Sequence, residues 1–333
     1  MEDIHSAEAY TELGVAAQEA GNYEAAKDYF EKALAMSKEE LGNDNKLLPI
    51  YYSNLGISLH KLGNYETAQI LLKNAIAANE KRFAKGHPTF IDLYVNFAIA
   101  LQDLGNYEKS QRLLEAAIAI EEKHFGKDSP NLATNYHNLA ASLQHLGNHK
   151  QAQIVLKKAI AINEKHFGND HPKVAANYDR LAIVLSYLGK CKEAKTLIEK
   201  AIAINEKHFE DKHPTLLTNY VNLATILEDL GENEEARDLL LRVIAIEQES
   251  LGADHPNLAT SYYNLATVFQ NLGENDKAKS LLLQAIAIEE VHLNHNNPSL
   301  ATSYANLSTV LVELKNYDQA QAFLRKAIAI AKE

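Results

Sequence analysis

The stretch "HFGNDHPKVA", residues 166–175, decides the fold because related blocks recur along the chain. Two histidines, an aspartate, a glycine and a proline within ten residues fit a metal site, a catalytic loop or a turn. A catalytic site is normally unique in a chain, whereas a connector in a repeat array occurs once in each repeat. The equivalent blocks are "HFGKDSPNLA" at 124–133, "HFEDKHPTLL" at 208–217, "SLGADHPNLA" at 250–259 and "HLNHNNPSLA" at 292–301. Each block starts 42 residues after the one before, which favours the connector.

The 42-residue period extends over all 333 residues. Tyrosine recurs at this period at positions 10, 52, 94, 136, 178, 220, 262 and 304. Glycine recurs at 21, 63, 105, 147, 189, 231 and 273, with Lys315 in the eighth place. We therefore predict one solenoid rather than several domains. Its eight repeats lie at approximately 1–42, 43–84, 85–126, 127–168, 169–210, 211–252, 253–294 and 295–333.

Each repeat contains two amphipathic segments of helical period. In "PNLATNYHNLAASLQHLG", residues 130–147, the apolar residues follow one another at spacings of four, three, one, three and three, which is one face of a helix. They are Leu132, Tyr136, Leu139, Ala140, Leu143 and Leu146. In "NHKQAQIVLKKAIAINEKHF", residues 148–167, the equivalent stripe is Ala152, Val155, Leu156, Ala159 and Ile160. The small residues on both stripes allow close approach of the two helices, so we expect an all-α fold of helix–turn–helix units.

The ends of these segments have the residues that begin and end helices. Ser129 is a good N-cap, Pro130 suits the first helical position, and Gly147 suits the turn that follows. In the opening stretch, His166 ends one helix, Gly168 breaks it and Pro172 begins the next. A metal site needs several converging ligands. The second histidine of the block is replaced by Ser129 in one repeat and by Asn297 in another, so we predict a turn without metal.

The pattern of aromatic, leucine, small and glycine positions resembles the tetratricopeptide repeat. In the third repeat the matching residues are Tyr94, Phe97, Ala98, Leu101, Gly105, Tyr107, Ser110, Leu114 and Ala117. The second repeat matches equally well at Tyr52, Leu55, Gly56, Leu59, Gly63, Tyr65, Ala68, Leu72 and Ala75. The 42-residue unit, with "AIAIxEKxFGxDHP" at the end of its second helix, is similar to the repeats of kinesin light chain. The resemblance covers the whole chain and implies an α-solenoid wound as a right-handed superhelix.

In that family the first helix of each repeat lines the concave face of the superhelix. The resemblance assigns six positions per repeat to this face, which we call the groove positions. Relative to the repeated tyrosine, they are the second residue before it and the first, second, fifth, eighth and ninth residues after it. One of them, two residues after the repeated tyrosine, is mostly asparagine and forms what we call the asparagine row. An asparagine amide both donates and accepts, so it can bind a peptide N–H and C=O together, and it can equally brace neighbouring helices. The row reads Glu12, Asn54, Asn96, Asn138, Arg180, Asn222, Asn264 and Asn306.

The groove positions are acidic. They hold two basic residues, Lys61 and Arg180, and nine acidic ones, a net charge of −7 out of −11 for the whole chain. We therefore expect a neutral or basic extended partner in contact with the asparagine row, with Asp103, Asp179 and Asp229 contributing charge. The nine acidic residues are Glu8, Glu12, Glu19, Asp92, Asp103, Asp179, Glu228, Asp229 and Glu313.

This charge argues against two ligands known for the family. Relatives that bind chaperone C-terminal carboxylates use lysines and an arginine around asparagines. Asn96, Asn138 and Arg180 match part of that arrangement, but Val95 and Ala176 stand in the lysine places. Kinesin light chain takes cargo peptides with acidic flanks in a basic groove, which is the opposite charge. The resemblance therefore implies the fold and not the same cargo.

Composition excludes several further classes of function. A net charge of −11 argues against nucleic-acid binding. Cys191 is the only cysteine, which fits a reducing compartment, and it has no recognisable partner base. No basic segment followed by an apolar run marks a signal peptide at the N-terminus, and no run approaches 18 apolar residues. We expect a cytoplasmic protein with no membrane segment.

Three functions remain to be weighed. The first is a non-catalytic scaffold that binds a protein or peptide partner through its concave face. The second is a structural solenoid that self-associates through its C-terminal repeat, whose last helix around Ile328 keeps the internal pattern without a polar capping helix. The third is an enzyme, but the sequence contains no nucleophile elbow, phosphate loop or HExxH motif. We predict the scaffold, with no catalytic residue, cofactor or metal.

Overall fold

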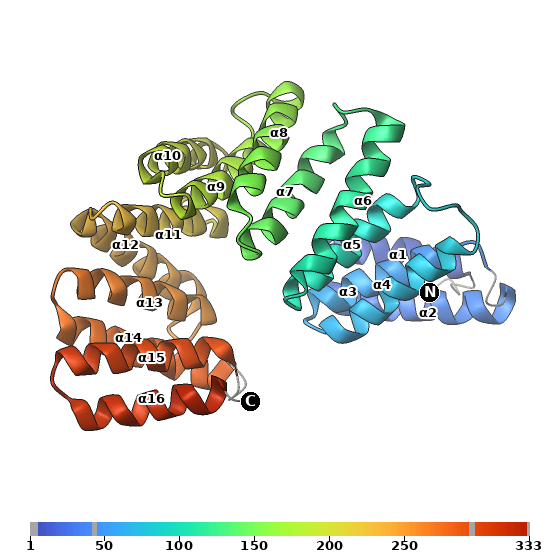
Figure 1. The fold of residues 1–333 in the computed structure, drawn as a ribbon. Helices are drawn as coiled ribbons and strands as arrows, with labels where there is room; N and C mark the ends of the chain where they lie inside the picture. Colours follow the sequence, from blue (N-terminus) through green and yellow to red (C-terminus); the bar gives the residue numbers. More distant parts are fainter. Residues whose placement is uncertain (1–5, 42–44, 293–296, 332–333) are drawn as a thin grey trace. The chain divides into compact units, whose positions relative to one another are not determined.

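A computed structural model describes residues 6–41, 45–292 and 297–331. Within these ranges the chain forms sixteen α-helices and no strand, which confirms the all-α prediction (Figure 1). The connector at 293–296 lies outside the described residues. By its internal contacts the chain divides into two compact units, residues 1–168 and 169–333, which hold four repeats each. The single solenoid and its right-handed winding stay predictions.

The first unit consists of four helix pairs. In Figure 1 the two helices of each repeat lie side by side and are joined by a short turn. The helices are α1 (Ala7–Glu19), α2 (Tyr23–Leu41), α3 (Leu48–Lys61), α4 (Tyr65–Glu80), α5 (Phe90–Asp103), α6 (Tyr107–Phe125), α7 (Pro130–His145) and α8 (His149–Phe167).

The second unit repeats this arrangement. Each odd-numbered helix packs on the even-numbered helix that follows it. The helices are α9 (Pro172–Tyr187), α10 (Cys191–His208), α11 (Pro214–Asp229), α12 (Asn233–Leu251), α13 (Pro256–Asn271), α14 (Asn275–His292), α15 (Pro298–Glu313) and α16 (Tyr317–Ala331).

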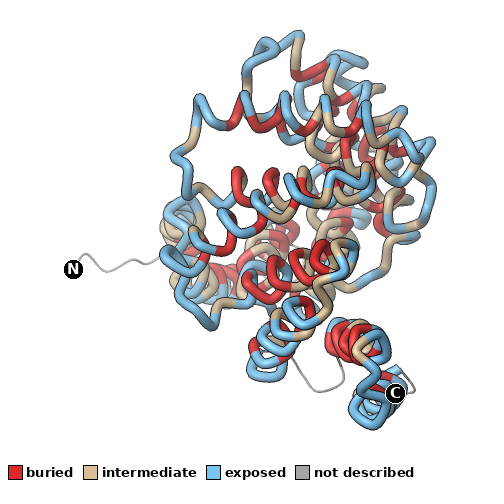
Figure 2. The backbone as a smooth tube through the Cα atoms, turned by 90° about the vertical axis from the view of Figure 1, so that its left-hand side faces the viewer, coloured by how far each residue is buried: buried red, intermediate tan, exposed pale blue. Residues whose placement is uncertain are grey.

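The core of each repeat is the apolar stripe that the sequence predicts. In α7 and α8, Leu132, Ala140, Ala152, Leu156 and Ala159 have no exposed surface. Val155, Ile160 and Leu146 are only half-buried, so the predicted stripe is wider than the buried one. Buried stretches lie along the helices in Figure 2, whereas the connectors are largely exposed.

The small position in the middle of each first helix permits the close helix contact. In the first repeat it is Gly14, where a Cβ atom would lie 2.6 Å from the ring of the buried Phe30. The second repeat has Gly56 at this position, and the third to fifth have Ala98, Ala140 and Ala182, which have no exposed surface. The first repeat therefore exchanges a methyl group on the first helix for a larger side chain on the second.

Helix ends agree with the predicted connector, with two differences. Helix α8 ends at Phe167, Gly168 follows at φ 80°, and Pro172 begins α9. Helix α5, however, begins two residues after Pro88. Ser129 stands at the N-cap position of α7, but its hydroxyl makes no capping bond and instead donates to Glu121 Oε1 at 2.5 Å. A hydrogen bond to a carboxylate is stronger than one from a neutral backbone amide, so Ser129 pairs with Glu121.

Candidate functional site

The asparagine row lies on the first helices at equivalent positions. Besides the exposed Glu12 on α1, its members in the first unit are Asn54 on α3, Asn96 on α5 and Asn138 on α7. In the second unit they are Arg180 on α9, Asn222 on α11, Asn264 on α13 and Asn306 on α15. All seven side chains are half-buried, which leaves part of each within reach of a ligand.

Four members of the row have side chains without a hydrogen bond to any described residue: Asn54, Asn96, Asn138 and Asn264. The helices that present them are braced through other groups. Gln18 Nε2 donates to the backbone carbonyl of Asn54 at 3.1 Å, and Gln102 Nε2 donates to that of Asn138 at 2.8 Å. The side-chain amides at these positions therefore keep their full capacity to bind a peptide backbone.

Two other members of the row brace the repeats. Asn222 Nδ2 donates to Asp179 Oδ1 at 2.9 Å, and the Asn306 amide donates to the hydroxyl of Tyr263. In each case the acceptor lies on the first helix of the preceding repeat. Asn222 and Asn306 therefore brace neighbouring repeats, whereas the other four asparagines leave their side-chain amides unbonded within the described residues.

Asp179 is the centre of a polar network rather than an open charge. Its carboxylate also accepts from Asn219 Nδ2 at 2.8 Å, and Asn219 in turn accepts from Asn205 Nδ2 at 2.7 Å. Burial raises the pKa of Asp179, while the bonds from Asn222 and Asn219 oppose that rise. Burial also lowers the pKa of the neighbouring Arg180, and the charge of Asp179 opposes that shift.

Most of the other predicted acids on the later repeats also have partners. Asp103 Oδ2 pairs with His60 Nε2 from the preceding first helix, and Asp229 accepts from the Ser186 hydroxyl. Glu228 accepts from Asn271 Nδ2 at 3.2 Å, and burial raises its pKa. The negative charge along the groove positions is thus partly used in bonds between repeats.

The open acidic surface is greatest in the first repeat. Glu8, Glu12 and Glu19 surround a hollow of about 500 Å³ whose apolar wall includes Val15 and Ile50. All three glutamates are exposed, and Ile50 is 49% exposed. Acidic residues around an apolar surface favour a partner with both basic and apolar side chains.

A second hollow follows the groove positions in the other unit. It has a volume of about 350 Å³ between α9 and α11. Its walls are Ile183, Ser186, Tyr187, Asn222, Thr225, Ile226 and Asp229, and six of these seven are groove positions. Tyr187 is 64% exposed and offers a large apolar surface with a polar end. Positions chosen from the sequence thus line concave surface in both units.

The connector histidines join the end of a second helix to the connector at the start of the same repeat, a role that sequence reasoning missed. His166 Nε2 donates to the backbone carbonyl of Asp128 at 2.7 Å, and His208 Nε2 donates to that of Asp170 at 2.7 Å. The second histidine of the block caps the next helix: the backbone N–H of Lys173 donates to His171 Nδ1 at 3.1 Å. Within the described ranges no three histidine, cysteine or acidic side chains are grouped as metal ligands.

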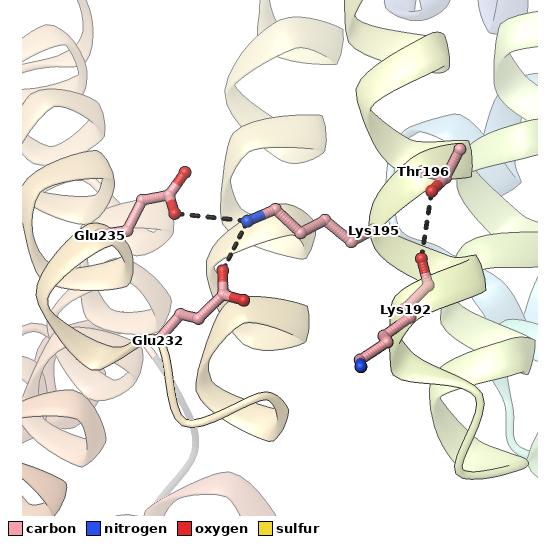
Figure 3. A network of polar contacts seen from close by, with 5 residues as sticks. All are labelled: Lys192, Lys195, Thr196, Glu232 and Glu235. Carbon is pink, nitrogen blue, oxygen red and sulfur yellow. Dashed lines mark hydrogen bonds and ion pairs between the residues drawn. The ribbon is translucent and has the colours of Figure 1, made fainter.

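Lysines away from the groove positions are paired with acidic residues, in some cases between repeats and in others within one repeat. Lys195 on α10 reaches Glu232 and Glu235 at the start of α12 (Figure 3). In the first unit Lys165 pairs with Asp128 at 2.6 Å. Such exposed pairs stabilise a protein only slightly, but they place acids and bases together on the outer surface. Cys191, at the start of α10, is half-buried and has a free thiol.

Comparison with known proteins identifies the repeat. A family model described as tetratricopeptide repeat matches residues 5–81, 89–165, 132–207, 215–290 and 273–333. No curated protein matches the chain significantly. Among solved structures, a protein of nearly identical repeats from a Podosopora anserina kinesin light chain is 30% identical, with a TM-score of 0.51 over 61% of this chain and 96% of that one.

Two other solved structures share the fold at lower identity. The apo form of the quorum sensor NprR from B. thuringiensis is 17% identical, with a TM-score of 0.77 over 99% of this chain and 90% of that one. A Rap protein complexed with competence and sporulation factor is 18% identical, with a TM-score of 0.62 over 92% and 80%. None of the helices in the described ranges is long and apolar enough to cross a membrane.

Proposed function

The chain belongs to the tetratricopeptide repeat family, and on that premise we propose that it is a non-catalytic protein–protein interaction scaffold. The groove positions bind an extended peptide or partner segment, and the asparagine row contacts its backbone. The observation that supports this most is the set of side-chain amides at Asn54, Asn96, Asn138 and Asn264, which are within reach and have no hydrogen bond to any described residue.

The fold neighbours agree with this proposal. One of them, the Rap protein, was solved in complex with competence and sporulation factor. Binding of a factor by a similar fold supports a scaffold role here, while the nature of the partner follows from this chain's own charge. The single cysteine supports a reducing compartment, and we propose the cytoplasm.

The partner segment is neutral or basic. Glu8, Glu12 and Glu19 present three exposed carboxylates around one hollow. The Debye length is about 8 Å at physiological salt and shortens to about 3 Å at 1 M, so these charges attract a bound basic chain less as salt is added. Binding of a lysine-rich segment should therefore weaken as the salt concentration rises. A library of random peptides that returned acidic sequences would contradict the charge preference.

The test of the scaffold function is capture of a partner followed by substitution in the row. Asn138→Ala should leave folding unchanged and weaken the affinity for the captured segment by about tenfold, because one backbone N–H and C=O of the ligand lose their partner. Gln151→Ala is a matched control, since Gln151 is an exposed amide on α8, the second helix of the same repeat, and is not a groove position. Equal loss in both variants, or none in either, would refute the role of the row.

Self-association through the last repeat is the second candidate function. Tyr317, Leu324 and Ile328 on α16 are 62%, 45% and 45% exposed. Apolar side chains on one helix suit contact with a second copy of the chain. Light scattering over a range of concentrations tests this, because Leu324→Glu with Ile328→Glu should abolish any dimer that the wild type forms.

A further inference from the structure

One buried polar position recurs near the C-terminal end of the second helices. Six members are at most 5% exposed: Ser37 in α2, Asn79 in α4, Glu121 in α6, Asn163 in α8, Asn205 in α10 and Glu247 in α12. A buried polar group is costly unless it is hydrogen-bonded, so each of these residues needs partners from the repeat that follows. Three glutamates stand at this position. Glu289 in α14 is half-buried and, like Glu247, has an Oε2 without a hydrogen-bond partner among the described residues, whereas Glu121 differs from both.

Glu121 has a donor for each carboxylate oxygen. Ser129 Oγ donates to Oε1 at 2.5 Å, and Asn135 Nδ2 lies 3.5 Å from Oε2. Both donors belong to the start of the next repeat. The charge at Glu121 is therefore held by the fold itself.

Glu247 lacks one of these donors. The equivalent of Asn135 is Ser261, whose hydroxyl bonds to the Glu247 carboxylate. The equivalent of Ser129 is His255, whose Nδ1 instead accepts from the backbone N–H of Asn257 at 3.2 Å and caps α13. Oε2 of Glu247 is buried with no hydrogen-bond partner among the described residues.

Glu247 also lines a cavity. The space has a volume of about 520 Å³ and lies between α11, the end of α12 and the start of α13. Leu217, Val221 and Leu251 give it apolar walls, while Thr260 and Ser261 add hydroxyl groups. Lys212 stands at the edge, but its ammonium pairs with Glu249 at 2.6 Å, so its charge is directed away from Glu247.

We infer that this cavity receives a cationic side chain, lysine or arginine, of a bound segment, and that Glu247 accepts a hydrogen bond from its ammonium or guanidinium group. The inference rests on the proposed function and names the partner chemistry at one site. The methylene stem of such a side chain fits against Leu217, Val221 and Leu251, with the charged end on the carboxylate. Asn222 lines the same cavity, which connects it to the asparagine row.

Burial without a second donor raises the pKa of Glu247, and Ser261 and His255 oppose this rise. An unpaired buried oxygen lowers stability, so its presence here and its absence at Glu121 fit a position whose partner comes from another molecule.

The experiment compares two labelled peptides of alanine and serine that differ at one residue, lysine or norleucine. Norleucine keeps the stem and lacks the ammonium. Wild-type protein should bind the lysine peptide at least about tenfold more tightly in fluorescence anisotropy, because a charge-assisted hydrogen bond distinguishes the two. An arginine peptide tests which cation fits better. Glu247→Gln should remove the discrimination between lysine and norleucine.

The control variant is Glu199→Gln. It removes the same charge from an exposed position on α10 that does not line the cavity, and it should keep the discrimination. Equal loss in both variants would mean that the overall negative charge attracts lysine, and the inference would be wrong. Ser250→Trp is a second variant that places a large side chain at the exposed edge of the cavity and should weaken binding of the lysine peptide without affecting the fold.

A small probe separates this inference from the proposed function. Butylammonium ion alone should shift the methyl NMR signals of Leu217 and Val221 in the wild type and not in Glu247→Gln. If it does so while no peptide binds, the cavity site stands and the scaffold function fails. If Asn138→Ala weakens peptide binding while butylammonium and Glu247→Gln have no effect, the scaffold function stands and the cavity inference fails.

Discussion

The cavity beside Asn79 in the first unit and the cavity beside Glu247 in the second occupy the same place in the repeat, four repeats apart. Each lies between a first helix, the end of its second helix and the start of the next first helix. Their volumes are about 610 and 520 Å³. The repeat thus preserves the hollow, although most of the residues around it differ.

The charge of the two cavities differs because of a few substitutions. Asn79 is neutral and its Nδ2 donates to Thr89 Oγ1 at 2.9 Å, while Lys46 and Arg82 stand on the same walls. At the corresponding place in the second unit the buried residue is Glu247, with an unpartnered oxygen. The comparison teaches that apolar positions set the shape of a repeat, whereas individual polar positions set what it can bind.

The largest expected effect tests whether the hydrophobic cores of the second and sixth repeats contribute equally to stability. Leu72 and Leu240 occupy the same position four repeats apart, and each is 1% exposed. Leu→Ala at either should lower the free energy of unfolding by about 2–5 kcal/mol through lost burial and a new cavity. Urea unfolding with hydrogen exchange on α4 and α12 measures both. If one variant left the free energy of unfolding unchanged while the other lowered it strongly, the two repeats would not have equivalent cores.

The next effect separates the two asparagines that line these cavities. Asn222→Ala removes a donor to the half-buried Asp179 and should cost about 1–3 kcal/mol, because the carboxylate keeps only Asn219. Asn54→Ala removes an amide with no side-chain partner in the described structure and should cost less than about 0.5 kcal/mol. Thermal unfolding of both variants measures the two stability losses and allows them to be compared. Equal costs would show that Asn222 does not brace α11 against α9.

This difference shows what the sequence could predict. The period alone identifies the buried faces, since Leu132 and Ala140 face the core whatever the repeat binds. It also places the asparagine row on one face of the first helices. It does not reveal which amides are occupied, because the acceptor of Asn222 lies 43 residues earlier and has no equivalent carboxylate in the other repeats.

The connector shows the same limit. Its glycine and proline predict a turn, but the carbonyl that His166 contacts lies 38 residues earlier and becomes a neighbour only when α7 and α8 pack side by side. Ser129 has the residue type of an N-cap, and yet a carboxylate eight residues earlier takes its hydroxyl. Local patterns predict elements, whereas contacts between repeats depend on which side chains compete for the same donor.

A third comparison uses the raised pKa of Glu247. Burial raises the folded-state pKa above the unfolded value, so the native state binds more protons between the two, and stability falls as pH rises through that window. Glu247→Gln removes this loss and should raise the melting temperature at pH 7, with a gain that shrinks as pH falls towards about 4. The quantity to measure is the difference in melting temperature between variant and wild type at each pH. A gain that grew on acidification would contradict the direction of the shift.

The smallest effect concerns a turn that also recurs four repeats apart. Gly147 ends α7 at φ 73°, and Lys315 ends α15 at φ 60°. The hydrogen bonds are the same: Gly147 N–H donates to Gln144 at 3.0 Å, and Lys315 N–H donates to Val312 at 2.9 Å. The backbone hydrogen bonds are thus equivalent in the two turns. A residue with a Cβ atom pays about 1–2 kcal/mol of conformational free energy in the left-handed region, and no hydrogen bond of this turn offsets that cost at Lys315.

Lys315→Gly should therefore stabilise the protein, and Gly147→Lys should destabilise it. Glycine also increases the conformational entropy of the unfolded chain, which offsets about 0.4–1 kcal/mol of this stabilisation. We therefore expect Lys315→Gly to raise the free energy of unfolding by about 0.5–1 kcal/mol. Hydrogen exchange of α15 and α16 resolves a change of this size where global unfolding would obscure it. If Lys315→Gly weakened the protection of these helices, the exposed lysine would have a stabilising contact of its own, and the two turns would not be equivalent.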